Sequence, residues 1–181
     1  MNPVAEQLDL LLKLVPNAKT IGTIYCSSEV NSQLQVELLK KAAAAKGVTV
    51  KEATVSTVND IQQAARSLAG DVQAVYVPTD NVLASAIPTL ISVTEEAKLP
   101  VICAEGGMVR AGGLATLGVD YYKLGFQTGV MAADILSGKA KPADMAIQAQ
   151  KEFKPTINLK EAAKIGLKVP EDLLKGAEVI K

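Results

Sequence analysis

Residues 21–32 read IGTIYCSSEVNS, a short apolar run that ends in small polar residues instead of an ordinary turn. Similar apolar runs begin at nearly constant spacing, at Val48, Ala74 and Val101, and a fifth run, ATLGV, ends just before Asp120. Helical patterns of about 15 residues separate the runs, as parallel strands joined by crossover helices require. The repeat therefore predicts an α/β fold with a doubly wound parallel sheet in the flavodoxin-like strand order 2-1-3-4-5.

Polar residues follow the predicted strands at the points where the strands end. Ligands of an open parallel sheet bind beyond the carboxyl ends of its strands, so we expect these residues to converge in space. The candidate ligand-binding residues are Ser27, Ser28, Asn31, Ser32, Thr79, Asp80, Asn81, Glu105, Gly106 and Asp120.

The chemistry of these residues suits a small zwitterion. Serine and asparagine side chains stand at the expected start of a helix, where unpaired N–H groups and the helix dipole favour a carboxylate. Gly106 and Gly107 let backbone N–H groups face a ligand, and Asp120 can bind an ammonium group. A site for the carboxylate of the ligand that faces several carboxylates of the protein indicates an amino acid.

Each group also has an ordinary structural interpretation, which the sequence leaves open. Asn31 or Ser32 can simply cap the helix that follows the first strand, and Asp80 or Asn81 can cap the helix after the third. Residues 105–107 can form a plain turn, and Asp120 can cap the helix that begins at the next residue.

The composition excludes several classes of protein. The chain has 181 residues, 49% of them apolar, which fits one domain, with or without an appendage, and a real core. Nineteen basic and nineteen acidic residues cancel, and four tyrosines and two phenylalanines are the only aromatics, so we expect no nucleic-acid partner. No run of about 18 uncharged apolar residues is present, and charges interrupt the first helix, so we expect no membrane span and read no signal peptide.

The motifs of enzymes and cofactor sites are missing. The first strand-to-helix turn, CSSEVNS, lacks the glycines of a dinucleotide site, and no glycine-rich loop is followed by the lysine of a P-loop. A phosphoacceptor domain would need a lysine after the fifth strand, where this chain has Asp120. With no histidine and two separated cysteines, a zinc site is not expected. We therefore expect a protein that is not an enzyme, with no cofactor and no metal.

The two cysteines, Cys26 and Cys103, end the first and fourth apolar runs. In the predicted strand order the third strand lies between them, which separates their Cα atoms by roughly 10 Å, beyond the disulfide limit of about 7 Å. We expect both to be free and buried.

Helix signals fill the segments between the strands. We expect a short helix over residues 6–14, one from Asn31 or Ser32 to about Lys46 with Leu34 on its apolar stripe, and one capped by Asn59 with Gln62 completing a capping box. The helix over residues 82–97 contains Pro88, so it either kinks or starts near that proline. A strand around residues 146–149, a helix capped by Asn158 and another begun by Pro170 are expected nearer the carboxyl terminus.

The helix over residues 121–136 is apolar or small on almost every face, which is typical of a buried helix. Gly125 and Gly129 permit close approach of another backbone, although ordinary packing of an alanine-rich helix explains them equally. We expect the helix either to fold back onto its own sheet or to be buried between two chains, and we favour a homodimer through residues 121–136.

The sequence resembles the ABC-transporter substrate-binding proteins that take up aromatic amino acids such as tryptophan, tyrosine and phenylalanine. The stretches that carry the resemblance are LVPNAKTIGTIYCSSEVNSQLQVELLKKAA, SLAGDVQAVYVPTDN, GGLATLGVDYYKLGFQTGVMAADILSGKAKPADM and INLKEAAKIGLKVPEDLL. In the first of these, Cys26 and Ser27 stand where family members often have Asn-Pro.

The resemblance implies a type I periplasmic-binding-protein architecture, in which two α/β lobes close on a ligand between them. It implies that residues 1–181 are a single lobe, the carboxyl-terminal one, without its amino-terminal partner. Residues 1–16 would be a lead-in helix from the hinge, 20–120 the βα core, 121–138 a helix that crosses to the missing lobe, and 139–181 the returning tail.

The resemblance implies that the chain is the solute-binding component of an ABC importer, or a truncated lobe of that component, and that it binds an amino acid, aromatic in type, without covalent bonds. The partners would be an amino acid, the missing lobe and an ABC permease, and the location would be extracytoplasmic, either periplasmic or lipid-anchored. A ligand-sensing domain of a transcription regulator and a flavodoxin-like enzyme of unknown chemistry are the alternatives.

Overall fold

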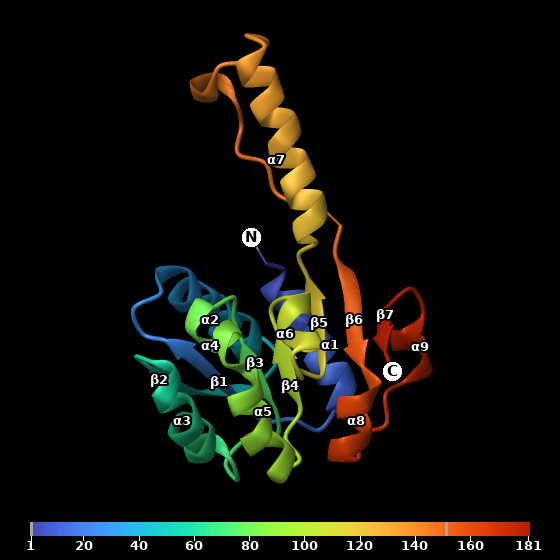
Figure 1. Cartoon of the computed structure of the whole chain (residues 1–181). Coiled ribbons are helices and arrows are strands. Elements are labelled where there is room, and N and C mark those ends of the chain that lie inside the picture. Colours follow the sequence, from blue (N-terminus) through green and yellow to red (C-terminus); the bar gives the residue numbers. More distant parts are fainter. Residues whose placement is uncertain (1, 151) are drawn as a thin grey trace.

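A computed structural model of the chain describes residues 2–150 and 152–181 (Figure 1). Within these residues, seven strands form one sheet in the order β2-β1-β3-β4-β5-β6-β7. The first five strands match the five apolar runs: β1 (Thr20–Cys26), β2 (Thr49–Val55), β3 (Val75–Val77), β4 (Val101–Cys103) and β5 (Ala115–Gly118). All pairings among them are parallel, so the predicted order 2-1-3-4-5 is confirmed.

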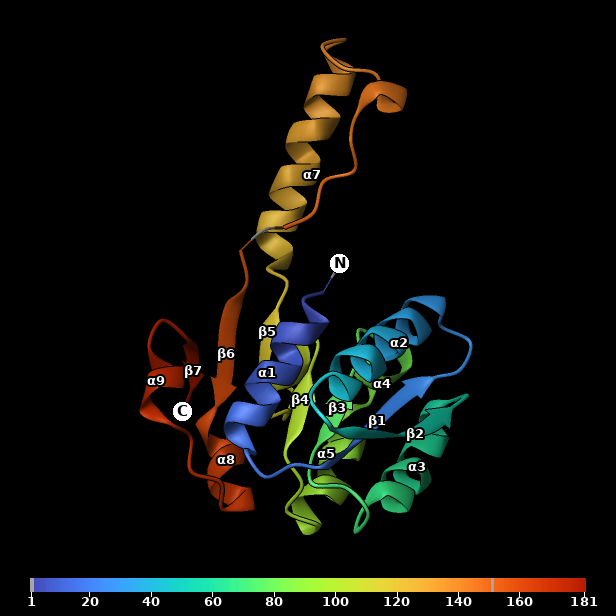
Figure 2. The ribbon, with the colours of Figure 1, turned by 180° about the vertical axis from the view of Figure 1, so that it is seen from behind.

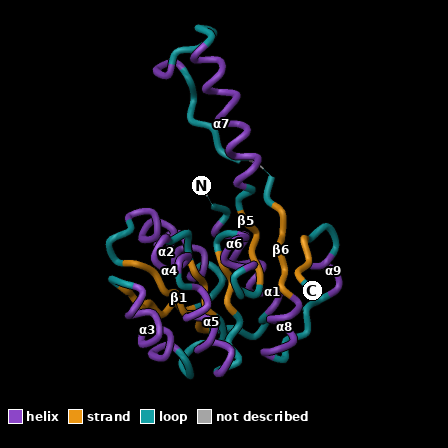
Figure 3. Tube along the Cα trace, in the orientation of Figure 1, coloured by secondary structure: helices purple, strands orange, loops and turns teal. Residues whose placement is uncertain are grey.

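Two further strands extend the sheet beyond β5. β6 (Lys154–Asn158) pairs antiparallel with β5, and β7 (Glu178–Ile180) pairs parallel with β6. The prediction of a strand around residues 146–149 was wrong, because these residues have no regular secondary structure. They run alongside a helix, away from the sheet, and so have no strand to pair with (Figure 3).

Helices cover both faces of the sheet. One face packs against α3 (Ile61–Leu68), α4 (Asn81–Ser85), α5 (Ile87–Glu96) and α6 (Gly106–Arg110). The other face, seen in Figure 2, packs against α1 (Val4–Leu14), α2 (Val30–Ala44) and α8 (Leu159–Ile165), and a short helix, α9 (Glu171–Leu174), precedes β7. Because both faces are covered, β1, β3 and β4 are almost wholly buried, as the apolar runs indicate.

The helix starts differ from prediction at two places. α2 begins at Val30 with Glu29 as its N-cap residue, so Asn31 and Ser32 lie within its first turn. A 3-10 turn, η1 (Val58–Asp60), precedes α3, and its capping box is formed by Thr57 and Asp60 instead of Asn59 and Gln62. Asp60 accepts hydrogen bonds from the backbone N–H groups of Ser56 (3.0 Å) and Thr57 (2.8 Å), which places the start of the turn upstream of the predicted cap.

Other predicted features of the helices are confirmed. α1 ends at Leu14, and α5 starts next to Pro88 after a break that separates it from α4. The side chain of Asn158 accepts a hydrogen bond from the Glu161 N–H (3.1 Å) and so caps α8, and Pro170 precedes α9. Cys26 and Cys103 are free and buried, and burial raises the pKa of the Cys103 thiol.

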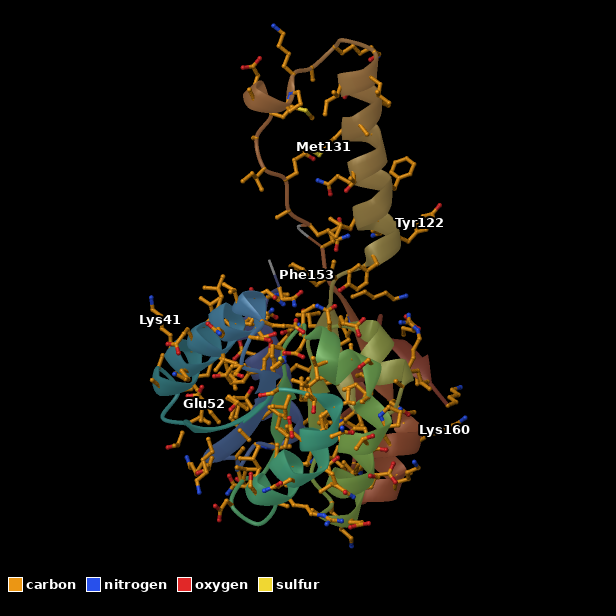
Figure 4. The ribbon with its side chains drawn as sticks, turned by 60° about the vertical axis from the view of Figure 1, so that its left-hand side comes forward. Lys41, Glu52, Tyr122, Met131, Phe153 and Lys160 are labelled. Atoms are coloured by element: carbon orange, nitrogen blue, oxygen red, sulfur yellow. The ribbon has the colours of Figure 1, made fainter. Side chains whose placement is uncertain are left out.

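The helix over residues 121–136, α7 (Tyr121–Leu136), projects out of the body of the molecule, and residues 137–150 return beside it (Figure 1). We call residues 121–150 the arm. Of the two alternatives for this helix, folding back onto its own sheet was wrong, because none of the residues of α7 is buried and Tyr122 and Leu136 are 84% and 88% exposed. Figure 4 shows Met131 on the side that faces the returning segment and Tyr122 on the outside. In the described parts of the chain, no helix has the length and apolar character needed to cross a membrane.

Candidate ligand-binding site

The carboxyl ends of β1, β3, β4 and β5 lie along one edge of the sheet, and all ten candidate residues follow these strand ends. Val77 and Cys103, the last residues of β3 and β4, are register partners, so the loops that follow them begin side by side. The loops interact through hydrogen bonds that the sequence did not predict in detail. These bonds separate candidates that are turned into the fold from candidates that face solvent.

Asp80 joins three of the surrounding segments. Its side chain is 1% exposed, and its Oδ2 atom accepts hydrogen bonds from the Cys26 N–H (2.7 Å) and the Ser32 hydroxyl (2.8 Å). Its Oδ1 atom accepts from the Leu83 N–H (3.0 Å) and so caps α4. Asp80 and the buried Ser32 therefore hold the loops in place, because their polar atoms are directed into the fold.

Asn31 and Thr79 face the solvent side of the same network. The Asn31 Nδ2 atom donates to the Thr79 carbonyl (2.7 Å), and the Ser32 hydroxyl, which donates to Asp80, lies 3.1 Å from the same carbonyl oxygen. The Gln35 Oε1 atom accepts from the Thr79 N–H (3.1 Å) and from Asn2 Nδ2 (2.9 Å). The first two turns of α2 are thus fastened to the loop after β3.

Glu29 is a residue that sequence reasoning missed. Its carboxylate accepts from the Asn81 N–H (2.9 Å), the Asn81 side-chain amide (3.0 Å) and the Val82 N–H (3.3 Å), at the start of α4. Glu29 is the N-cap residue of α2, yet it makes no side-chain capping bond there. An acidic residue that follows a strand end was the only signal available, because its partner Asn81 lies 52 positions away.

Ser27 and Ser28 are exposed next to the start of α2. The Ser27 carbonyl accepts from the Gln33 side-chain amide (2.6 Å), and the Ser28 hydroxyl lies 3.2 Å from the Cys26 sulfur. These contacts fix the turn between β1 and α2 and leave the side of the turn that faces the carboxyl edge of the sheet uncovered.

Glu105 and Asp120 are both helix caps. Glu105 accepts from the N–H groups of Gly107 (2.7 Å) and Met108 (2.6 Å), and Asp120 Oδ1 accepts from those of Tyr122 (3.0 Å) and Lys123 (3.1 Å). The capping interpretation is therefore confirmed for Asp120, whereas the plain turn considered for residues 105–107 was wrong, because Gly106 begins α6 and Glu105 caps it. The expectation that Gly107 offers its N–H to a ligand was wrong, because a carboxylate two residues away in the chain takes that donor.

The candidate residues that line a hollow are distributed over two hollows. The larger, of about 600 Å³, has Asn31, Thr79 and Gln35 among its polar lining and Leu34, Tyr121 and Leu124 among its apolar lining. The smaller, of about 280 Å³, is lined by Glu105, Gly106 and Asp120 together with residues of α6, β5, β6 and β7. Ser27, Ser28, Ser32, Asp80 and Asn81 belong to neither lining.

The apolar wall of the larger hollow was not predicted. Leu34 was expected on the buried stripe of α2 but is 49% exposed, because α2 turns that side toward the carboxyl edge of the sheet. Tyr121, the first residue of α7, and residues 147–150 of the returning segment complete the wall. Partial burial and then the nearby Glu105 carboxylate raise the pKa of Tyr121, so its hydroxyl stays neutral.

The Gln150 side chain links the end of the arm to the residue that precedes α7. The Gln150 Oε1 atom accepts from the Asp120 N–H (3.0 Å), and its Nε2 atom donates to the Asp120 carbonyl (2.6 Å). Gln127 and Gln148 form a further hydrogen bond (2.6 Å) higher on the arm. The wall that Tyr121 and residues 147–150 contribute to the hollow is thereby held against the sheet.

Comparison with known proteins identifies relatives along the whole chain. Residues 1–181 match the family described as ABC transporter substrate binding protein. A tyrosine-binding protein of Clostridioides difficile is 42% identical over 137 residues, which are 76% of this chain and 40% of that protein.

Two solved structures superpose closely. A conserved domain protein of Vibrio cholerae has a TM-score of 0.94 at 36% identity, over 100% of this chain and 61% of that one. The ABC domain from Streptococcus pneumonia in complex with L-Trp has a TM-score of 0.92 at 39% identity, over 99% of this chain and 61% of that one. The chain thus spans about two fifths of the tyrosine-binding relative and about three fifths of the two solved chains.

Proposed function

Because the chain belongs to the ABC transporter substrate-binding protein family, we propose that it is one lobe of the solute-binding protein of an importer and holds an aromatic amino acid by non-covalent contacts. The family consists of substrate-binding proteins, which are not enzymes, and this disfavours the flavodoxin-like enzyme. It also disfavours the ligand-sensing domain of a regulator.

The larger hollow at the carboxyl edge of the sheet carries the proposal. Its polar side, with Asn31, Gln35 and Thr79, suits the ammonium and carboxylate of an amino acid, and its apolar side, with Leu34 and Tyr121, suits a large side chain. The tyrosine-binding relative, at 42% identity, and the solved complex with L-Trp, at 39%, both hold an aromatic amino acid.

The ligand carboxylate would lie at the start of α2. Glu29 turns its carboxylate toward α4, so the first N–H groups of α2 receive no side-chain cap of their own. Ser27, Ser28 and Asn31 surround this end of the helix, where the dipole favours an anion. Ser32 and Asp80 position the loop from within, and Asn81 is held beside it by Glu29.

The ligand ammonium would lie where the larger hollow meets the smaller one, toward Asp120, because Val119 and Tyr121 on either side of Asp120 line both hollows. The Asp120 Oδ1 atom accepts both capping bonds of α7, whereas its Oδ2 atom receives no hydrogen bond within residues 2–150 and 152–181. Glu105 and Gly106 border the same side of the cleft. A carboxylate oxygen without another donor is a suitable partner for an ammonium group.

The partners of the lobe follow from the arm and from the family. α7 presents Tyr122, Phe126 and Leu136 to solvent, and a first lobe packed on this face would bury them and complete the ligand site. The full protein would deliver its ligand to an ABC permease from an extracytoplasmic location, periplasmic or lipid-anchored. Where the first lobe is lacking, a second copy of the chain would cover α7 as a homodimer.

Titration of this chain with tryptophan, tyrosine and phenylalanine at neutral pH tests the proposal. One lobe encloses a ligand on one side only, so we expect dissociation constants in the millimolar range or weaker in calorimetry. Amide shifts in NMR should move at Asn31, Gln35, Thr79 and Asp120 and stay constant at Asn17 and Lys19, at the opposite edge of the sheet. Micromolar binding to a monomer, or shifts at the opposite edge, would contradict the one-lobe site.

A further inference from the structure

The smaller hollow lies beside α6, where β5, β6 and β7 meet the base of α7. Figure 1 shows these elements together: α6 lies in front of β5, β6 and β7 continue the sheet beyond it, and α7 rises above. The amino-acid site proposed above uses Glu105, Gly106 and Asp120 at one side of this hollow and leaves the residues of β5, β6 and β7 that line it unused.

The floor of the hollow is a row of polar side chains across three strands. Thr116 of β5 is the register partner of Thr156 of β6, which is the register partner of Glu178 of β7. Thr116 is 0% exposed, and its hydroxyl has no hydrogen-bond partner in the described parts of the chain. Buried hydroxyls are nearly always paired, so a partner from outside the chain is expected for one that lines a hollow.

Gly118 leaves space beside the buried Thr116 hydroxyl. A Cβ atom at this position would lie 3.1 Å from the Thr116 Oγ1 atom and 3.1 Å from the Glu105 Cα atom, so any side chain would fill the space above the hydroxyl. Lys154 is the register partner of Gly118 and lines the hollow. A hydroxyl donor and an ammonium group therefore border the space that the glycine leaves.

The charges of the lining leave one cation unpaired. Glu105 and Asp120 direct their carboxylates to the first N–H groups of α6 and α7, and Glu178 forms an ion pair with Arg110 (3.0 Å). Lys154 has no ion-pair partner within residues 2–150 and 152–181. Glu178 is thus paired with Arg110, Glu105 and Asp120 accept from backbone N–H groups, and the ammonium of Lys154 is available to an anion.

We propose that the smaller hollow binds a small carboxylate anion, which pairs with the Lys154 ammonium and accepts a hydrogen bond from the Thr116 hydroxyl. This site borders the proposed amino-acid site at Glu105, Gly106 and Asp120, but its two binding groups, Thr116 and Lys154, are not part of that site. Its volume of about 280 Å³ admits a compact ligand of few atoms.

Thermal unfolding with acetate as the probe tests the site, with chloride at equal ionic strength as the reference. We expect acetate to raise the Tm of the wild type by roughly 3–6 °C at ten times its Kd. Thr116→Val should lose this acetate-specific rise. In chloride the same variant should melt above the wild type, because it removes an unpaired buried hydroxyl.

Thr23→Val is the matched control. Thr23 of β1 is also 0% exposed with an unpaired hydroxyl, but it lines neither hollow. It should melt higher in chloride, as Thr116→Val does, and keep the full rise in acetate. A rise in acetate that is equal in Thr116→Val and the wild type would overturn the proposal, as would a Thr116→Val variant that melts below the wild type in chloride.

The variant Lys154→Met and a second probe, the free amino acid glycine, complete the test. Lys154→Met should abolish the acetate-specific rise, whereas Lys139→Met, on the exposed tip of the arm, should retain it. Glycine has the same carboxylate but carries an ammonium group. A stabilisation by glycine without one by acetate would overturn the proposal, because it would make the hollow part of an amino-acid site.

Discussion

At the scale of single residues, the carboxylates of this chain have different roles that their neighbours decide. Asp80 is buried and joins the loops after β1 and β3, whereas Glu29 is partly exposed and caps a helix distant in sequence. Both follow strand ends and look alike in the sequence. Their roles follow from whether the carboxylate points into the fold or across its surface.

Glu161 is a buried carboxyl group with a pH-dependent effect on stability. It is 2% exposed, its Oε1 atom has no hydrogen-bond partner in the described residues, and the Lys164 Nζ atom is 3.9 Å from its Oε2 atom. Lys164 instead forms an ion pair with Glu95 (2.6 Å). Burial, together with the neighbouring Glu95, raises the pKa of Glu161 to about 7.

The raised pKa of Glu161 predicts that the free energy of unfolding falls as the pH rises from about 4.5 to about 7. In this window the unfolded chain releases the Glu161 proton while the folded chain retains it. Rising pH therefore stabilises the unfolded state relative to the folded state. The hydrogen bond from Lys164 lowers the pKa of Glu95, so Glu95 changes the free energy of unfolding only at more acid pH. Glu161→Gln, which stays neutral, should remove this slope and unfold at higher denaturant than the wild type at pH 8.

Urea unfolding of both proteins from pH 5 to pH 8 measures the effect. Glu171→Gln, a change at an exposed residue of α9, is the control and should keep the slope of the wild type. Parallel pH profiles for the wild type and Glu161→Gln would show that Glu161 is not the group responsible.

At the scale of elements, the arm is fastened to the sheet where its two ends meet. The Gln150 side chain bonds both backbone groups of Asp120, as a neighbouring strand would, and the Asp120 side chain caps α7. Lys123 and Glu152 add an exposed ion pair (3.4 Å) that contributes little. The direction of α7 therefore depends chiefly on one side-chain amide.

Gln150→Ala should loosen the base of the arm. A hydrogen bond contributes about 0.5–1.5 kcal/mol, so we expect the Asp120 amide to exchange its hydrogen up to about tenfold faster. Hydrogen exchange followed by NMR measures this. Gln148→Ala, which removes the bond to Gln127 higher on the arm, should leave the Asp120 amide unchanged. Equal exchange in Gln150→Ala and the wild type would show that the backbone alone holds the arm.

At the scale of the whole molecule, the chain has a body with a buried sheet and an arm that is exposed to solvent. The sheet is buried on both faces, whereas α7 exposes Tyr122, Phe126, Val130 and Leu136. Each large apolar side chain left in water forgoes on the order of 1.5–3 kcal/mol. This surface favours association with another lobe or another copy.

We expect the chain by itself to form a dimer through α7 at tens of micromolar. Light scattering behind a sizing column should give twice the monomer mass for the wild type and the monomer mass for Phe126→Glu. Thr128→Glu, which adds the same charge on the opposite side of α7, should remain dimeric. The body should unfold at the same denaturant concentration in both variants, because Phe126 is 69% exposed and outside the core. A monomeric wild type would refute the dimer.

The sequence by itself determined the strand order, the edge at which the candidates lie and the free state of the cysteines. Apolar periodicity, cap residues such as Asn158 and the proline in the first turn of α5 act over a few residues, so they can be read along the chain. The same local reading could not place Asn31, Leu34 or the cap of α3, because those depend on where a helix begins and which side faces the sheet.

Tertiary structure alone decided the contacts between distant segments and the direction in which α7 leaves the body. The bonds of Glu29 to Asn81 and of Gln150 to Asp120 join residues 52 and 30 positions apart, and no local pattern marks such partners. The apolar faces of α7 correctly indicated a helix that needs a partner. Whether that partner lies in the same chain is a question of geometry, and the structure shows α7 directed away from its own sheet, because the base of the arm is fixed at Asp120 and both faces of the sheet are already covered.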